Sequence, residues 1–378
     1  MPRVFPAPSS ATARLSIEQR VVLACAGQTI GGARPEEIGA SCRSGSFDWD
    51  ALTAQAVAHR VTPLVITQVM ALAGDSVPDA VAGAWRCFLD EHHRAEAARR
   101  TVVRDVLDFF EARQIRVMLL KGEAYDRAMR RDPGLLEASD IDVLVDSAWT
   151  RFPSHDRTTL SAFTESGGVE FGFQRHHDVD MNRVLDIDYR GLWDRARTMD
   201  GRTHARIMSA EDMLLTACVG LCRRRYRLLK DMAPVGDMVA AAGVDWARLV
   251  ATARGMAADR IVFTALTVVQ SLLGCEVPAT ALRALEPRAW RRRVLRHLAD
   301  MVIAHMFPER RSVKESRRSR LVGECLRVAS YHRHHYWPEM QARLVNWQLR
   351  HLDAAGDNGR RNVVFSCARW LAPLEPHM

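Results

Sequence analysis

Short apolar segments of β type interrupt a chain whose periodicity is otherwise helical, and this change of pattern constrains the fold most strongly. Residues 15–113 carry apolar side chains at every third or fourth position, which predicts a succession of helices. Residues 115–120 and 141–145 are compact apolar runs separated by a helical stretch and an Asp-Pro-Gly turn, and they predict two strands. Helical periodicity returns from Ser209 onward. The pattern predicts an α+β fold with a small mixed sheet flanked by N-terminal and C-terminal helical regions.

A third strand is predicted over residues 183–189, where apolar and polar side chains alternate. In this register Asp186 and Asp188 share one face of the strand, and the apolar residues between them share the other. The polar residues 151–182 before it are expected to form a helix and a connection. The sheet would therefore contain three strands, two of which carry acidic residues.

Three regions follow from these patterns. We expect an N-terminal helical region over residues 1–100, a core that carries the sheet over 101–208, and a C-terminal helical region over 209–378. Ser209 and Asp212 have the spacing of a capping box, with Asp in place of the usual Glu, and predict the start of a helix. The helices predicted after it cover residues 213–232, 245–255, 258–273, 279–301, 317–335 and 338–351.

The composition is that of an ordinary soluble globular protein, with 48% hydrophobic and 26% charged residues. No apolar run reaches the length of about 18 residues that a membrane span needs, and the N-terminus lacks the apolar core of a signal peptide. We therefore expect a cytoplasmic protein without a membrane partner. Its eight cysteines have no disulfide-scaffold spacing, so most are expected to be buried free thiols.

The net charge of +8 is concentrated in one stretch of the chain. Thirteen Arg or Lys residues and five acidic residues lie between Glu286 and Trp337, which accounts for the whole excess of positive charge. Such a face fits an anionic partner, whether a triphosphate, a nucleic acid, an acidic peptide or an acidic protein surface. A solvated helix face in an Arg-rich protein explains the same pattern, and the sequence does not choose between the two.

Two acidic residues in the second predicted strand carry the chemical signal. Asp140 and Asp142 are separated by one residue, so their side chains project from the same face of the strand. Two like charges among apolar neighbours are costly to bury, and a bound divalent cation is the usual resolution. Asp186 in the third predicted strand supplies a further carboxylate. Three carboxylates with substrate phosphates match the two-metal arrangement for phosphoryl transfer, which predicts Mg²⁺ or Mn²⁺ as the cofactor.

The chain between the first two strands offers an anion site. Gly122 follows the first strand where a helix begins, so free backbone N–H groups there are accessible to a phosphate. Lys121 adds a positive charge at the same place, Glu123 follows directly, and Ser139 precedes the acidic strand.

This order of glycine turn, helix and acidic strand resembles a known family. The segment VMLLKGEAYDRAMRRDPGLLEASDIDVLV is similar to the signature of the bacterial uncharacterised nucleotidyltransferase family, a branch of the polymerase-β-type superfamily. The similarity extends over most of residues 15–275. It implies three catalytic metal ligands, a fourth acid beside them, and a set of nucleotide-binding residues that includes a lysine of a later helix. The ligands are Asp140, Asp142 and Asp186, with Asp188 as the fourth acid, and the nucleotide-binding residues are Lys121, Gly122, Glu123, Ser139 and Lys230.

Three positions depart from the family pattern. Glu123 occupies the place of a serine in the wider superfamily, and Leu136 the place of a common arginine, for which Arg130 or Arg131 would substitute. Asp188 stands where the family has histidine, which adds a fourth carboxylate near the metals as a ligand or as a tuning charge. The three acids of the triad remain, so an active enzyme is expected.

The resemblance implies a metal-dependent enzyme that moves NMP from an NTP to a hydroxyl-type acceptor and releases pyrophosphate. It also implies a tailoring role, in which the acceptor is a modified peptide or another small molecule. Two alternatives stay open on the sequence. One is a non-catalytic nucleotide-binding or antitoxin-like partner, and the other is a nucleic-acid-binding protein that uses residues 286–337.

Overall fold

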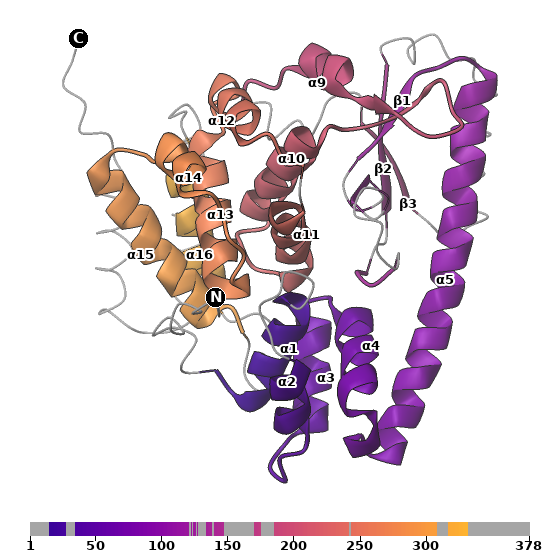
Figure 1. Cartoon of the computed structure of the whole chain (residues 1–378), viewed down its shortest axis with the longest axis vertical. Coiled ribbons are helices and arrows are strands. Elements are labelled where there is room, and N and C mark those ends of the chain that lie inside the picture. Colours follow the sequence, from indigo (N-terminus) through magenta and orange to yellow (C-terminus); the bar gives the residue numbers. More distant parts are fainter. Residues whose placement is uncertain are drawn as a thin grey trace, which may run out of the picture.

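A computed structural model gives the fold of the chain. Figure 1 shows N-terminal helices, a small sheet beside one long helix, and a group of C-terminal helices, which is the arrangement expected of an α+β protein. No helix in the described part of the chain is long and apolar enough to cross a membrane. The residues that the structure describes are 15–27, 35–120, 122, 124–125, 127, 134–137, 140–146, 170–174, 185–241, 243–307 and 317–331.

Four short helices at the N-terminus pack against one another and bury their apolar faces. The first helix contacts the second, third and fourth, and the second and third helices also pack against the fourth. The Asp48 carboxylate caps the third helix by accepting a backbone hydrogen bond from Ala51 at 2.9 Å. The four helices are α1 (Ile17–Gly27), α2 (Pro35–Cys42), α3 (Trp49–Ala58) and α4 (Thr62–Ala73).

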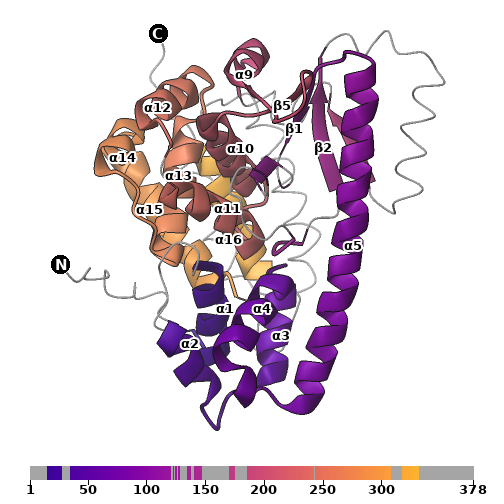
Figure 2. The same ribbon diagram turned by 45° about the vertical axis from the view of Figure 1, so that its right-hand side comes forward.

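One long helix, α5 (Asp79–Ala112), runs from the N-terminal helices to the sheet (Figures 1 and 2). Near its middle Glu96 and Arg99 form a buried ion pair with an N···O distance of 2.6 Å. Gly134 packs closely on this pair, because a Cβ at its position would lie 2.8 Å from Cγ of Glu96. The ring of His92 also forms a hydrogen bond with the Gly134 carbonyl. The long helix therefore holds the turn that precedes the acidic strand.

Within the described residues, the sheet has five strands in the order β3-β2-β1-β5-β4. Strand β1 pairs antiparallel with β2 and parallel with β5, and β2 pairs parallel with β3, so the sheet is mixed as expected. The two predicted apolar strands are confirmed as β1 and β2. Strand β3 lies within residues 151–182, where a helix and a connection were expected. The bounds are β1 (Val117–Leu119), β2 (Asp140–Val145), β3 (Glu170–Gln174), β4 (Arg197–Thr198) and β5 (Ala205–Ile207).

The prediction of a strand over residues 183–189 is wrong for residues 185–189, which the structure describes. The described residues before Tyr189 belong to no strand, and α9 (Tyr189–Arg195) begins there. The predicted alternation of burial is nevertheless present, since Leu185 is buried while Asp186 and Asp188 are exposed. An alternation of apolar and polar residues indicates which side chains face the core. A strand also requires a hydrogen-bonded neighbouring strand, which this alternation does not predict.

The C-terminal region is helical as predicted, but two predicted helices are each divided. The helix predicted over residues 213–232 is interrupted after Arg223, and the helix predicted over 279–301 is interrupted at Glu286, which precedes Pro287 and is therefore disfavoured in a helix. The helix predicted over 338–351 lies outside the described residues. The helices are α10 (Ala210–Arg223), α11 (Leu229–Ala240), α12 (Trp246–Gly255), α13 (Asp259–Leu273), α14 (Ala279–Leu285), α15 (Ala289–His305) and α16 (Arg317–Ala329).

The turn between α10 and α11 is imposed by tertiary packing. Arg225 and Tyr226 both have left-handed backbones, with φ of 64° and 54°, which is costly for residues other than glycine. The buried Tyr226 hydroxyl lies 3.2 Å from Oγ of Ser330, directly after α16. Gly323 of α16 allows the turn to approach, because a Cβ there would lie 2.7 Å from the Arg225 carbonyl oxygen. Helix α16 thus stabilises a backbone that local propensity disfavours.

We expect Gly323→Ala to destabilise the protein, although alanine has a higher helix propensity than glycine. The new Cβ has to displace the Arg225 backbone, and overpacking of this kind costs about 1–3 kcal/mol. The matched control is Gly220→Ala in α10, where a Cβ meets nothing within 4 Å and should stabilise by about 0.5–1 kcal/mol. Urea unfolding of both variants measures the difference, and equal stabilities would contradict the role given to α16.

Candidate functional site

The acidic strand β2 lies inside the sheet, between β1 and β3. The backbone N–H of Leu120 donates to the Asp142 carbonyl at 3.0 Å, which continues the pairing of Leu119 with Val143. The chain that leaves β1 toward the glycine turn therefore passes directly beside Asp142. The Asp142 side chain is buried, with 7% of its surface exposed, and Asp140 begins the strand two residues earlier. The segment that leads from β1 to Gly122 thus begins beside Asp142.

On its other side β2 pairs with a strand that the sequence analysis missed. The parallel register places Gly172 opposite Asp142 and Glu170 opposite Asp140. Glycine has no side chain, so the place across from Asp142 is not filled by its partner on β3. Glu170 adds a further acidic residue at the start of the strand pair. The sequence signal for β3 is weak, because the strand has only five residues, includes a glycine and lies within a polar segment.

Tyr125 connects the acidic strand with the C-terminal helices. It lies shortly after Gly122, and it packs against the hydrophobic core. Burial raises the pKa of Tyr125, and the neighbouring Cys218, Asp231 and Asp142 raise it further, while Arg224 acts in the opposite direction. The Tyr125 phenol thus interacts electrostatically both with Asp142 of the acidic strand and with Asp231 at the start of α11.

The start of α11 carries a buried carboxylate among cations. Asp231 pairs with the Arg224 guanidinium at 2.7 Å, and its side chain is 7% exposed whereas that of Arg224 is 39% exposed. Burial raises the pKa of Asp231, and the positive charges of Arg224, Lys230 and Arg60 oppose this effect. Lys230, predicted to contact the nucleotide, lies in this group. Its backbone N–H donates to the His59 carbonyl at 3.3 Å, so the N-terminal helices meet α11 at this point.

Asp186 is held by its backbone and not by a strand. Its N–H donates to the Met256 carbonyl at 3.1 Å, in the turn between α12 and α13, and its side chain is exposed. Asp188, two residues later, caps α9 by accepting a hydrogen bond from the Gly191 N–H at 2.8 Å. The other carboxylate oxygen of Asp188 lies 3.7 Å from the Arg195 guanidinium. The segment that contains Asp186 and Asp188 is therefore attached to the C-terminal helical region.

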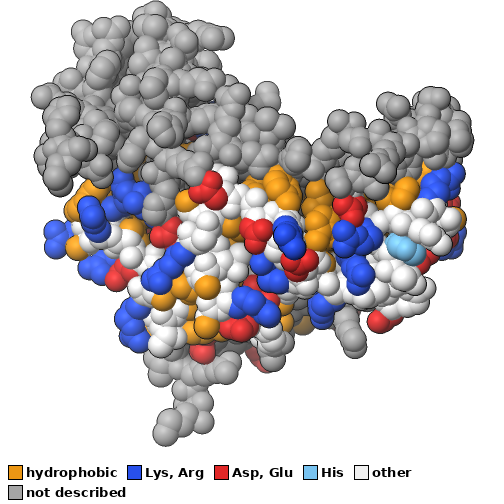
Figure 3. Space-filling view, turned by 90° about the horizontal axis from the view of Figure 1, so that it is seen from above, with side chains coloured by type: hydrophobic (Ala, Val, Ile, Leu, Met, Phe, Trp, Pro, Cys, Tyr) orange, Lys and Arg blue, Asp and Glu red, His pale blue; other side chains and the backbone are white. Residues whose placement is uncertain are grey.

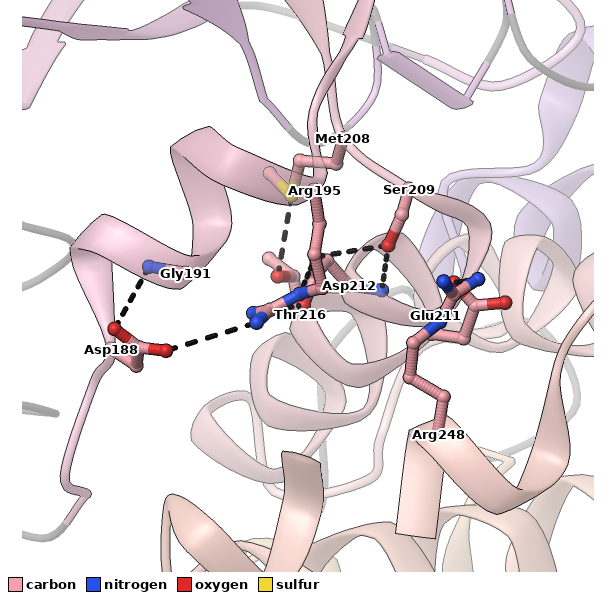
Figure 4. A network of polar contacts seen from close by, with 9 residues as sticks. All are labelled: Asp188, Gly191, Arg195, Met208, Ser209, Glu211, Asp212, Thr216 and Arg248. Carbon is pink, nitrogen blue, oxygen red and sulfur yellow. Dashed lines mark hydrogen bonds and ion pairs between the residues drawn. The ribbon is translucent and has the colours of Figure 1, made fainter. Parts of the chain in front are cut away.

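Figure 4 shows how this segment is joined to α10. Arg195 at the end of α9 points toward both Asp188 and Asp212, and it binds the Asp212 carboxylate with two hydrogen bonds of 2.8 and 3.0 Å. Asp212 is fully buried and also accepts from the Ser209 hydroxyl at 2.9 Å. The Asp212 N–H in turn donates to the Ser209 oxygen at 3.2 Å, which confirms the predicted cap of α10. The hydrogen bonds to Asp212 also raise the pKa of Arg195, so its guanidinium stays protonated.

A second pair at the same helix end joins α12 to α10. Glu211, which is buried, lies 2.9 Å from the Arg248 guanidinium and accepts from the Asp245 N–H at 2.8 Å. Although burial acts the other way, these hydrogen bonds lower the pKa of Glu211. Asp245 also caps α12 by accepting from the Arg248 N–H at 3.0 Å. The first turn of α10 thus anchors both α9 and α12 through adjacent acidic residues.

The face that carries α9 and α12 has mixed charge. In Figure 3 the Lys and Arg side chains alternate with Asp and Glu over the described part of this face, without one large patch of a single sign. The excess positive charge of the protein is therefore not gathered on this visible surface.

The structure tests the predicted site residues unequally. Gly122 is helical and exposed, and a Cβ there would meet nothing within 4 Å. Within the described residues no group of three or more His, Cys, Asp or Glu side chains is close enough to hold a metal ion. The side chain of Asp140 is outside that description, so the assembly of the triad stays a prediction. Outside the described residues altogether lie Lys121, Glu123 and Ser139.

A comparison with protein families decides what kind of core this is. The model of a family described as an uncharacterised nucleotidyltransferase matches residues 45–274, which is more than half of the chain. The chain belongs to this family. No curated protein and no solved structure matches the chain.

The extent of the match assigns the elements to the nucleotidyltransferase core. It begins just before α3 and ends directly after α13, so it includes the sheet, α9 and the network around Asp212. Helices α3 and α4, with His59 between them, are part of it, whereas α1 and α2 precede it. Helices α14, α15 and α16 lie beyond the match. Membership indicates a role in nucleotidyl transfer for the matched part of the chain.

We expect Arg195→Gln to destabilise the nucleotidyltransferase strongly. The substitution leaves the buried Asp212 carboxylate without its ion pair, and breaking a buried pair in this way costs about 3–5 kcal/mol. The matched control is Arg190→Gln in the same helix, whose 4.0 Å pair with Asp194 is exposed and contributes about 0.5 kcal/mol or less. Urea unfolding measures both, and a loss of less than about 1 kcal/mol in Arg195→Gln would refute the anchoring role.

Proposed function

We propose that this protein transfers NMP from an NTP to a hydroxyl group of a peptide or small-molecule acceptor and releases pyrophosphate. The observation that carries the proposal is the position of Asp142. It is a buried carboxylate on an inner strand of a nucleotidyltransferase core, beside the chain that leads to Gly122. A buried acid next to the start of a helix suits a metal-bound triphosphate, because metal ions bind the carboxylate and the free backbone N–H groups of the helix start bind phosphate oxygens.

The donor set fits a hard divalent cation. Asp140 and Asp142 follow one another at a spacing of two on β2, which directs both carboxylates to one face, and oxygen ligands of this kind suit Mg²⁺ or Mn²⁺. We propose Asp186 as the third ligand, from its exposed segment next to α9. Bound ions would supply a more acidic attacking hydroxyl and a stabilised leaving group. We propose that Asp188 caps α9 and is not a metal ligand, because one of its oxygens accepts from the Gly191 N–H and the other faces the Arg195 guanidinium.

The remaining residues of the site orient the nucleotide. Backbone N–H groups at Gly122 would bind phosphate oxygens, with Lys121 adding charge. Lys230 from α11 and the half-exposed Arg224 from the end of α10 would contact the phosphates, since Asp231 holds the Arg224 guanidinium in place. A guanidinium fixed by a buried carboxylate loses little freedom on binding, which favours precise orientation of the reacting phosphate.

The test of this function is Asp142→Asn in an assay of pyrophosphate release with each labelled NTP, Mg²⁺ or Mn²⁺ and candidate hydroxyl acceptors. Loss of one metal ligand should remove several kcal/mol of transition-state stabilisation, which corresponds to a rate lower by about a hundredfold or more. Circular dichroism confirms that the variant is folded. Near-normal turnover in folded Asp142→Asn would exclude the assignment. Metal-dependent NTP binding by the wild type without turnover would instead favour a non-catalytic nucleotide-binding partner.

Asp186 and Asp188 should respond differently to removal. We expect Asp186→Ala to abolish transfer with little loss of stability, because its side chain is exposed and is proposed as a metal ligand. Asp188→Ala should lower the stability by about 1 kcal/mol through loss of the α9 cap, and should retain more activity. Kinetics and urea unfolding of both variants separate the two roles. The opposite ranking of activities would assign the third carboxylate to Asp188.

A further inference from the structure

Helix α10 ends in a backbone conformation that its own sequence does not explain. The N–H groups of Arg225 and Tyr226 donate to the carbonyls of Cys222 and Leu221, each at 2.9 Å, which is the hydrogen-bond pattern of a Schellman motif. Such a motif needs one left-handed residue, and Arg225 supplies it with φ of 64°. Tyr226 is left-handed as well, with φ of 54°, although the motif does not require it and a bulky side chain rarely adopts this conformation.

Three other helices of the described chain end with the same pair of hydrogen bonds. Their left-handed residues are Arg60, Gln114 and Ala257, and the residue that follows each of them is not left-handed. Among these helix ends, a second left-handed residue therefore occurs only after α10. It lies between Arg224 and Lys230, the two cations proposed to contact the nucleotide phosphates. Strain of this kind persists where the surrounding structure enforces it, and it is concentrated at functional sites.

The strained turn is held in place from α16. Tyr226 is fully buried, and its hydroxyl donates to the Ser330 oxygen at 3.2 Å. Ser330 is itself fixed, because its hydroxyl donates to the Leu326 carbonyl at 2.8 Å and lies 3.3 Å from the Thr264 hydroxyl oxygen. Ser330 therefore joins α13, α16 and the turn at one buried point.

The first turn of α11 is supported from the end of α15 as well. The Lys230 N–H donates to the His59 carbonyl, so the backbone of His59 lies directly beside the start of α11. The buried His59 ring packs edge-on against Phe307, with 4.6 Å between the ring centroids. Phe307 comes two residues after the end of α15. Phe307 thus supports His59, and His59 supports the start of α11.

The side chain of Arg224 depends on the course of this turn. Arg224 follows α10, whereas its partner Asp231 belongs to α11, and their side chains meet at 2.7 Å across the turn. The path of the turn therefore determines where the Arg224 guanidinium lies. Because a guanidinium binds a phosphate through two parallel hydrogen bonds, a small change in its position weakens this contact.

Both supporting residues come from beyond the nucleotidyltransferase match, which ends at residue 274. Helix α16 packs against α15, and α15 packs against α13, which contacts α10 and α11 in turn (Figures 1 and 2). The last helices thus form one packed group with the helices that carry Arg224 and Lys230. A movement within this group would change the positions of both cations.

We propose that Ser330 and Phe307 are positioning residues for the nucleotide. They fix the turn and the first residues of α11, and in this way they place Arg224 and Lys230 against the phosphates of the NTP. The proposal rests on the function proposed above, in which these two cations contact the nucleotide. It adds that the helices beyond the family match serve nucleotide binding as well as stability.

The test begins with Tyr226→Phe, which removes only the hydroxyl that donates to Ser330. We expect the Kd of NTP with Mg²⁺ to rise about fivefold, the factor that corresponds to one neutral hydrogen bond. The binding of inorganic tripolyphosphate, which carries only the phosphate part, should weaken by the same factor. Phe307→Leu, which removes the aromatic contact with His59, should act in the same direction. In both variants hydrogen exchange should become faster in residues 224–231.

The matched control is Thr53→Val, which removes a side-chain hydrogen bond of the same length, 3.2 Å, between Thr53 of α3 and Trp85 of α5. It should lower the stability in urea by a similar amount and keep the NTP affinity of the wild type. Circular dichroism confirms the fold of every variant. Equal weakening of NTP binding in Thr53→Val would overturn the proposal, because the effect would then follow stability and not position.

Wild-type NTP affinity in both Tyr226→Phe and Phe307→Leu would also overturn it, as would unchanged hydrogen exchange in residues 224–231. If the wild type itself binds no NTP with Mg²⁺ or Mn²⁺, the proposed function fails and this proposal fails with it. That result is distinct from equal NTP binding by the wild type and the variants, which refutes the positioning role alone.

Discussion

The buried carboxylate of Asp212 is the constraint on which the arrangement of the site depends. A charge without solvent has to be paired and hydrogen-bonded, and Arg195 and Ser209 meet this requirement from two directions. Arg195 is the last residue of α9, and α9 begins at the cap formed by Asp188. The segment that contains Asp186 thereby takes its position from α10 and not from the sheet. The position of Asp186, which is proposed for catalysis, thus depends on the buried carboxylate of Asp212.

The sheet supplies the other half of the site, and its register brings distant parts of the chain together. The antiparallel pairing of β1 with β2 sets the exit from β1 beside Asp142, and the contact of Gly134 with α5 holds the chain that enters β2. The start of α11 completes this neighbourhood through Tyr125 and Asp231. N-terminal helices, sheet and C-terminal helices all contribute to one region.

The C-terminal helices combine two tasks. Helix α16 supports the strained turn before α11 and so belongs to the structure of the core, although it lies outside the family match. Helix α15 instead exposes arginines and an indole at its start. Part of the positive charge that the sequence concentrates after Glu286 is held in ion pairs, such as that of Arg292 with Glu286. A count of charges along the chain cannot show which of them are paired.

The sequence by itself determined the features that depend on near neighbours. The helices, the apolar strands β1 and β2, the cap at Ser209 and the spacing of Asp140 and Asp142 all follow from patterns a few residues long. Most of the family's signature lies in the same segments, so membership was also predicted from residues 117–145 and the segments after them. These predictions succeeded because backbone hydrogen bonding within a helix and alternation along a strand are local properties.

The tertiary structure alone decided whether an extended segment found a partner and which charges met. The segment around Asp186 alternates like a strand but has Met256 and α9 as its neighbours, whereas β3, with a weaker pattern, pairs with β2. The helix expected to run on after Arg223 is interrupted because Ser330 and Gly323 stabilise a left-handed turn. Arg195 and Asp212 are 17 residues apart, and only the folded chain brings them to 2.8 Å. Such contacts depend on long-range packing energies, which no local pattern of residues records.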